Sequence, residues 1–209
     1  MRPIYFLFAV AVVLFSCNNS GGDKQAGDAD SSQAGPAPGG AGSKTVVDAV
    51  NDLKSVLESK DKNSIANLFQ YPLADTVLPV YIDDSVFKKN YTSAGDKLTR
   101  SMFISYYDAI SKDTYLDKIT EIFKYLSVDS LQYNNTLHIE FTKAGEDCNQ
   151  YYEIANNDGV VTLTYGLNGH QPDSKASAEE QEIGCEFASF WIFRFEGGKL
   201  HFVRQASAG

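Results

Sequence analysis

The sequence predicts an α+β domain, with helices first and an antiparallel sheet after them, behind an N-terminal export segment. Apolar residues recur at helical spacing from about residue 46 to residue 126. After Asp129 the apolar period falls to two, which is the period of a half-buried strand. Helices followed by a run of antiparallel strands are typical of the α+β class. We expect one such domain over residues 45–209, a length that leaves room for a hydrophobic core.

Residues 1–16 have the layout of a secretory signal peptide. Arg2 supplies a positive charge, and the apolar run from Ile4 to Phe15 is too short to span a bilayer as a helix. The run closes on Cys17 instead of on a plain small-residue cleavage site. It resembles the signal of bacterial lipoproteins, which implies that the Cys17 sulfur carries a lipid and that Cys17 becomes the first mature residue. A cysteine thiolate is the strongest side-chain nucleophile for such an alkylation.

The alternative is an ordinary signal peptide with an incidental cysteine, because Phe15 stands where lipoprotein signals commonly carry a small residue. The next segment favours lipidation. Residues 17–44 are rich in Gly, Ala, Ser and Asp and hold no large apolar side chain, so we expect a disordered linker after Cys17. As a Gly-rich coil this linker has a root-mean-square span of about 28 Å. A lipid anchor followed by such a linker is a coherent design.

The signal and linker resemble those of Bacteroidota lipoproteins. This resemblance implies a place in the bacterial cell envelope, with the lipid bilayer as the partner of the acylated N-terminus. Asn18 favours the outer membrane, because it stands in place of the aspartate that often retains such proteins in an inner membrane. The periplasmic side and the surface side both stay open.

The chain is acidic, with a net charge of −9. Removal of residues 1–16 takes away one cation, Arg2, and lowers the net charge to −10. Nucleic-acid phosphates need basic patches, so the composition argues against a nucleic-acid partner. The sequence also has no cluster of Lys and Arg that would hold anionic lipid by charge.

Four helices are predicted before residue 127 from apolar spacing and capping residues. They are a helix over 45–59 with Val46, Val50, Leu53 and Leu57 inward; a short helix capped by Asp61 or Asn63 with Ile65, Leu68 and Phe69 inward; a helix capped by Thr99 with Met102, Phe103, Tyr106, Tyr107 and Ile110; and a helix from Asp113 or Thr114 with Ile119, Ile122, Phe123 and Leu126. Pro72 ends the second helix, because the residue before a proline is pushed into extended geometry. A strand or loop follows through 77–82, with Phe87 and Tyr91 turned inward.

The strands are predicted from alternation. A half-buried strand covers Leu137–Phe141, and strands at 151–154 and 160–165 flank the turn Asn156-Asn157-Asp158-Gly159. A long polar loop is expected over 166–182. The segment Cys185–Phe195 is apolar on both faces, which predicts a strand inside the sheet that is covered on both sides. A last strand covers 200–204.

The order of elements resembles the nuclear-transport-factor-2-like (NTF2-like) family, a cystatin-like α+β fold. The residues that carry the likeness are the opening helix, Asp61–Phe69, Tyr71-Pro72-Leu73 and the final hairpin through Gly197-Gly198. The resemblance implies a cone in which helices pack on a bent antiparallel sheet and enclose a pocket. Members of this family include isomerases and dehydratases as well as many non-enzymatic binders. No family catalytic set matches this sequence residue by residue, so no catalytic residue is carried over.

Cys148 and Cys185 are the pair that remains if Cys17 carries a lipid. In an oxidising compartment we expect a disulfide between them. It would close a loop over residues 149–184 and stabilise the fold by about 3–4 kcal/mol. The alternatives are a metal site or a nucleophilic thiol, but no histidine lies at metal-ligand spacing from either cysteine.

Candidate ligand contacts are few. His138 and Glu140 share the polar face of one strand, and they would shuttle a proton if that face lined the cone. On an outer face they are solvated polar residues. Tyr106, Tyr107 and Trp191 combine an aromatic body with a polar tip and suit a pocket wall, with core packing as the alternative. No metal site, cofactor site or hydrolase motif is indicated.

The sequence therefore predicts a membrane-anchored lipoprotein of the cell envelope. We expect its domain to be a non-catalytic binding module for a small apolar or amphipathic ligand or for an envelope protein. The alternative is an envelope enzyme of the isomerase or dehydratase kind, which would need an acid–base residue inside the cone, within hydrogen-bond reach of a tyrosine.

Overall fold

The computed structural model describes residues 44–143, 148–169 and 185–209. The chain divides into two units, residues 1–40 and residues 41–209, and the described residues all belong to the second unit. The predicted signal peptide (1–16), the lipidation site Cys17 and almost all of the linker (17–44) lie outside the described residues. None of the described helices is long and apolar enough to cross a membrane.

Short helices and two very short strands make up the first part of the described chain. They are α1 (Val46–Ser59), α2 (Lys62–Ala66), β1 (Leu73–Ala74), α3 (Ser85–Ser93), β2 (Lys97–Leu98), α4 (Arg100–Ser105), α5 (Tyr107–Asp113), α6 (Leu116–Tyr125) and the 3₁₀ turn η1 (Val128–Gln132). The long strands follow. They are β3 (Thr136–Thr142), β4 (Cys148–Asn157), β5 (Val160–Gly169), β6 (Phe187–Glu196) and β7 (Lys199–Ala208).

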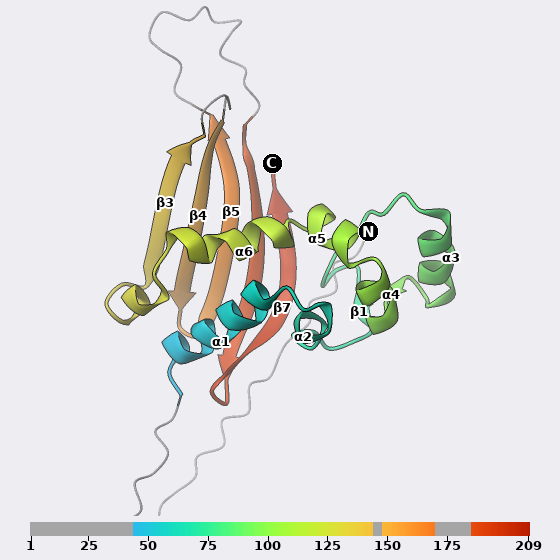
Figure 1. Ribbon diagram of the computed structural model, residues 1–209, viewed down its shortest axis with the longest axis horizontal. Coiled ribbons are helices and arrows are strands. Elements are labelled where there is room, and N and C mark those ends of the chain that lie inside the picture. The colour runs from blue at the N-terminus through green and yellow to red at the C-terminus, as the bar shows by residue number, and fades with distance from the viewer. Residues whose placement is uncertain (1–43, 144–147, 170–184) are drawn as a thin grey trace, which may run out of the picture. The chain divides into compact units, whose positions relative to one another are not determined.

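The long strands form one antiparallel sheet in the order β3-β4-β5-β6-β7, so each strand pairs with the next one along the chain. The short strands β1 and β2 pair separately, with Leu73 opposite Leu98. Figure 1 shows α1 and α6 crossing one face of the large sheet, with α2, α4 and α5 gathered beside its β7 end. The predicted α+β class is therefore confirmed.

The first two helices begin where capping chemistry places them. Thr45 and Asp48 form a capping box at the start of α1, which confirms the predicted helix over 45–59. Asp61, and not Asn63, caps α2. The second helix is shorter than predicted, since it ends at Ala66 and leaves Phe69 buried beyond it.

The third and fourth helices differ more from the prediction. The helix capped by Thr99 breaks at Tyr106 into α4 and α5, because the Tyr106 backbone leaves helical geometry (φ −110°, ψ 20°). The next helix, α6, begins at Leu116, after Tyr115 adopts a left-handed conformation. Thr114 instead ends α5, and its hydroxyl donates to the Ile110 carbonyl.

The sequence analysis did not predict α3. Asp84 caps this helix by accepting a hydrogen bond from the Phe87 backbone N–H. Phe87 is buried as expected, whereas Tyr91 is half-buried and stacks on Phe87. The nine residues of α3 carry too few apolar positions to give a helical period.

The strands are longer than alternation alone predicted. The predicted loop over 166–182 is wrong at its start, since β5 continues to Gly169, and residues 170–182 lie outside the described residues. β6 begins at Phe187 and pairs with both β5 and β7, so the predicted strand lies inside the sheet. Cys185 lies just before it.

The prediction that both faces of β6 are covered is wrong. Trp191 and Phe193 are almost fully buried on the face toward the helices, whereas Phe190 and Ile192 on the other face are half-buried. On the helix side, the Trp191 indole N–H donates to the Thr114 carbonyl at 3.0 Å. The helices among the described residues thus cover one face of the sheet, and the large apolar residues of β6 fill that interface.

The predicted disulfide between Cys148 and Cys185 is confirmed, with a Cα–Cα distance of 5.7 Å. Cys148 is the first residue of β4 and pairs with Gly169 of β5, and Cys185 precedes β6 on the far side of β5. The bridge therefore ties β4 to β6 across the end of β5.

Candidate functional site: a charged groove between two helix pairs

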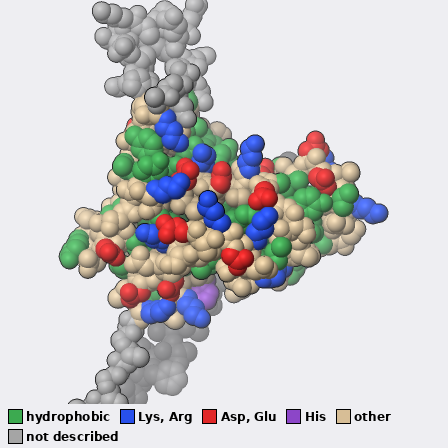
Figure 2. All heavy atoms as spheres, in the orientation of Figure 1, with side chains coloured by type: hydrophobic (Ala, Val, Ile, Leu, Met, Phe, Trp, Pro, Cys, Tyr) green, Lys and Arg blue, Asp and Glu red, His purple; other side chains and the backbone are tan. Residues whose placement is uncertain are grey.

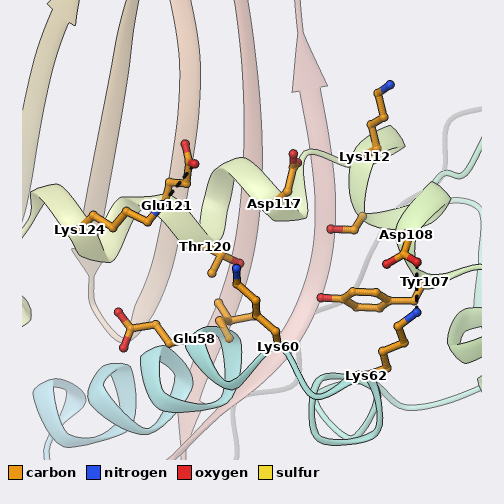
Figure 3. Close-up of a pocket in the computed structure, with 12 residues that line it drawn as sticks. Glu58, Lys60, Lys62, Tyr107, Asp108, Lys112, Asp117, Thr120, Glu121 and Lys124 are labelled. Atoms are coloured by element: carbon orange, nitrogen blue, oxygen red, sulfur yellow. Dashed lines mark hydrogen bonds and ion pairs between the residues drawn. The ribbon is translucent and has the colours of Figure 1, made fainter.

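A groove of about 620 Å³ lies between the end of α1 and the start of α2 on one side and α5 and α6 on the other. We refer to it as the helix groove. Its uncharged lining residues are Leu57, Tyr107, Ser111 and Thr120. Its charged lining residues are Glu58, Lys60, Lys62, Asp108, Lys112, Asp117, Glu121 and Lys124. Figure 3 shows these side chains extending from both helix pairs.

Local turn chemistry builds the lower wall of the groove. Lys60 ends α1 in a left-handed conformation (φ 55°), and its N–H bonds to the Leu57 carbonyl. Asp61 then starts α2 at once by capping it. This two-residue connection turns the chain sharply and places Lys60 and Lys62 at the rim, while Leu57 stays buried below them.

Tyr107 supplies the aromatic part of the groove. Its ring packs edge-on against the buried Phe103, with centroids 5.8 Å apart, and in Figure 3 its hydroxyl points into the groove. Burial raises the pKa of the Tyr107 hydroxyl, although Ser111 beside it acts in the opposite direction. The hydroxyl is therefore protonated at neutral pH and available as a hydrogen-bond donor.

The charges of the groove balance, with four lysines and four carboxylates in its lining. Figure 2 shows Lys and Asp or Glu side chains intermingled over the face that the helices form. Two ion pairs join some of these groups. The Lys62 ammonium lies 3.2 Å from Asp108 and 5.3 Å from the Tyr107 ring centroid, and Lys124 lies 3.3 Å from Glu121.

Glu121 connects the groove to the core. Its carboxylate accepts a hydrogen bond from the Tyr152 hydroxyl at 3.1 Å, and Tyr152 is fully buried in β4. Burial alone would raise the pKa of Glu121, but the hydrogen bonds from Tyr152 and Lys124 and the charges of Lys118 and Lys124 together lower it below its usual range. Glu121 is therefore ionised at neutral pH.

Four charged groups of the lining remain, namely Glu58, Lys60, Lys112 and Asp117. Among the described residues, none of the four forms an ion pair. In Figure 3 the Lys60 side chain extends from the end of α1 toward α6, whereas Lys112 points away from Tyr107. The groove thus holds uncompensated charges of both signs, with Lys60 directed inward.

The aromatic residues proposed from the sequence separate in the structure. Tyr107 lines the helix groove. Tyr106 faces α3, where its hydroxyl donates to Asp84 at 3.2 Å and its ring packs on Phe87. Trp191 is 1% exposed and belongs to the core. The two neighbouring tyrosines thus point in different directions at the break between α4 and α5.

His138 and Glu140 lie on the face of the sheet away from Trp191, and they are partly open to solvent. The His138 Nε2 lies 3.9 Å from Glu140, its Nδ1 lies 3.5 Å from Glu153 on β4, and its ring stacks on Tyr151. The Tyr151 ring in turn lies over Gly166, where an added Cβ would meet it at 2.2 Å. This outer cluster is separate from the helix groove.

Sequence reasoning missed most of the groove. The available signal was the run of alternating charges Lys60-Asp61-Lys62 between two predicted helices. Charged residues at a helix end are most often only solvated, so this signal does not distinguish a site. Within the described parts of the chain, no three His, Cys, Asp or Glu side chains gather as a metal site would require.

The chain matches no protein-family model and no curated protein at a significant level.

Proposed function

We propose that this protein is a lipid-anchored binding module of the bacterial cell envelope, whose folded domain binds a small ligand in the helix groove. The signal segment ending in Cys17 and the linker after it support the anchor. The disulfide Cys148–Cys185 supports an oxidising compartment, because such bonds are rare in the cytosol.

The observation that carries the binding function is the helix groove itself. Its volume of about 620 Å³ falls within the range of about 300–1,000 Å³ of small-molecule sites. Leu57 and Tyr107 are its apolar lining residues, and charged side chains, with Lys60 directed inward, make up most of the rest. The lining is mostly charged, which favours a polar ligand over an apolar one.

The groove favours binding over catalysis. A general acid or base works best with a pKa near the working pH. The pKa of Glu121 is lowered and that of Tyr107 is raised, so both move away from neutrality. His138 and Glu140, the pair considered for a proton shuttle, lie on the other face of the sheet. The isomerase or dehydratase alternative therefore lacks support from its own candidate residues.

We also propose that the domain is a divergent relative of the NTF2-like family. Helices packed on one face of a five-stranded antiparallel sheet support this relation. In a cone of that kind the ligand would lie between helices and sheet, but here Trp191, Tyr152 and Phe193 fill that space. This packing supports a ligand site between the helices instead.

Replacement of Cys17 by serine tests the anchor. We expect the wild-type protein to fractionate with membranes and to carry a lipid on the Cys17 sulfur in mass spectrometry of the native protein. The Cys17→Ser variant should lose the lipid and leave the membrane fraction. An unmodified sulfur, or an uncleaved leader in the wild-type protein, would remove the basis for the anchor.

A fragment screen by NMR tests the groove. We expect small polar fragments to shift the resonances of Tyr107 and Thr120, which line it. Thr120→Trp should abolish these shifts by filling the groove, whereas Ser101→Trp on the exposed surface of α4 should leave them unchanged. Fragment binding that persists in Thr120→Trp would place the binding site elsewhere and refute the proposal.

A further inference from the structure

We propose that the helix groove recognises a dipolar small molecule, one that carries both an anionic carboxylate or phosphate and an ammonium group. This inference rests on the proposed binding function and names the chemical class of the ligand. Its basis is the set of charges that the fold leaves without partners in the groove.

The first step is the charge balance of the lining. The whole chain has a net charge of −9, yet the groove lining holds equal numbers of lysines and carboxylates. The ion pairs Lys62–Asp108 and Lys124–Glu121 neutralise half of these groups. The groups left over are two cations and two anions, so the unsatisfied part of the groove is itself dipolar.

The second step is the position of the donors. Lys60 is held at the end of α1 by its left-handed backbone and by the hydrogen bond of its N–H to Leu57. Figure 3 shows its side chain directed toward α6 and the Tyr107 hydroxyl directed into the same groove from α5. An ammonium and a phenol that converge on one space form an anion site, since both donate hydrogen bonds.

The third step places the ammonium of the ligand. Glu58 and Asp117 supply carboxylates from α1 and α6, on opposite walls of the same groove. Neither is neutralised by a lysine among the described residues. The ammonium group of a ligand would bind beside one of these carboxylates. The anionic group of the same ligand would then bind at Lys60.

A ligand with a single charge fits less well. A lone anion at Lys60 would share the groove with the carboxylates Glu58, Asp108 and Asp117, and a lone cation would share it with Lys60. Like charges about 4 Å apart repel appreciably near a protein surface. A dipolar ligand meets both signs at once. Amino acids and short peptides have this chemistry, and so does the phosphoethanolamine headgroup of a lipid.

Titration calorimetry on the full-length protein in detergent tests the inference with the dipeptide Ala-Ala. We expect Ala-Ala to bind, and to bind about tenfold more weakly once its amine is acetylated or its carboxylate is amidated, because each block removes one charge-assisted contact. Free phosphoethanolamine and phosphatidylethanolamine vesicles form the second arm. Binding of these probes with the same dependence on Lys60 would assign the headgroup as the source of the same chemistry.

Lys60→Gln should weaken Ala-Ala binding about tenfold and leave the binding of the amidated peptide unchanged, since that peptide has no carboxylate for Lys60. Lys89→Gln, which removes the same charge from exposed α3, is the matched control and should bind like the wild type. Equal binding of free and blocked peptides, or an unaffected Lys60→Gln variant, would overturn the inference.

The two proposals fail differently. If no dipolar probe binds, but other fragments bind the wild-type groove and no longer bind the Thr120→Trp variant, the ligand class is wrong and the binding function stands. If Thr120→Trp blocks no fragment at all, both proposals are wrong.

Discussion

At the scale of single residues, this fold depends on buried polar atoms that find partners across the interface between helices and sheet. The Trp191 indole N–H donates to the Thr114 carbonyl, and the Ser189 hydroxyl approaches the same carbonyl at 3.5 Å. Tyr152 reaches out of the sheet to Glu121 on α6. Each of these bonds joins a strand to the chain near α6. They fix where the helix lies and so position one wall of the groove.

Trp191→Phe should destabilise the protein by about 2 kcal/mol, because it removes one hydrogen bond and leaves a small gap in a packed core. Urea unfolding followed by circular dichroism measures this loss. Tyr133→Phe is the control, since Tyr133 is 81% exposed, and its effect should stay within about 0.5 kcal/mol. A loss from Trp191→Phe no larger than that of the control would show that the indole bond does not matter.

Glu121 makes part of the stability depend on pH. Its pKa in the folded protein lies below the ordinary value of 4.5, so its contribution is complete above that value and is lost as the pH falls through the folded pKa. Tyr152→Phe removes a hydrogen bond to this carboxylate and should cost about 1–2 kcal/mol near pH 7. The difference from the wild type should shrink at an acid pH below the lowered pKa of Glu121, where the carboxyl group is protonated. Urea unfolding at both pH values checks this, and a difference independent of pH would contradict it.

At the scale of elements, the groove results from how the helices end and begin. Lys60 and Tyr115 both adopt left-handed conformations, one between α1 and α2 and the other between α5 and α6. These short connections hold the two helix pairs in place on either side of the groove. In the sheet, the disulfide likewise holds elements together, since it ties β4 to β6 across the end of β5.

Removal of the disulfide by Cys148→Ser together with Cys185→Ser should lower the free energy of unfolding by about 3–4 kcal/mol, because the unfolded chain regains the entropy of a closed loop. Urea unfolding of the double variant measures this change. The wild-type protein in reductant should show the same loss, whereas the variant should not respond to reductant. An unchanged unfolding midpoint in the double variant would mean that the bond adds nothing to stability.

At the scale of the whole molecule, the described core belongs to one unit, residues 41–209. Among the described positions, buried hydrophobic residues occur from Ala49 to Phe193. Every helix that borders the groove contributes at least one of them.

A fragment of residues 41–209 should accordingly fold without the N-terminal segment. We expect its urea midpoint and its near-ultraviolet circular dichroism to equal those of the full-length Cys17→Ser protein. The reason is that all the described caps, strand pairs and buried contacts lie within the fragment. A clearly lower midpoint would show that the N-terminal segment contributes to the stability of the domain.

Local physics explains which elements were predictable. Helical apolar spacing identified α1, and the Asn156–Gly159 turn identified the β4–β5 hairpin. The break at Tyr106 and the helix α3 were missed. At Tyr106 the apolar spacing continues through the break, and α3 is held mainly by one buried ring, Phe87. Neither feature leaves a clear period in the sequence.

The candidate site was less predictable than the fold. Residue type predicts a pocket wall equally for Tyr107 and Trp191. Tyr107 does line the groove, whereas Trp191 is buried in the core. Lys60, Glu58 and Asp117 are ordinary solvated charges when considered alone. Their proximity depends on how α1 and α6 lie together, which no local pattern encodes.

The sequence by itself determined the class of the fold, the Thr99 cap, the cysteine pair and the expectation of an exported chain, because these depend on residue type and short-range spacing. Only the tertiary structure decided which face of the sheet is covered and which charges share a groove. The physical reason is that these features arise from contacts between elements far apart in the chain. Such contacts are fixed by packing of the whole core and not by any one segment.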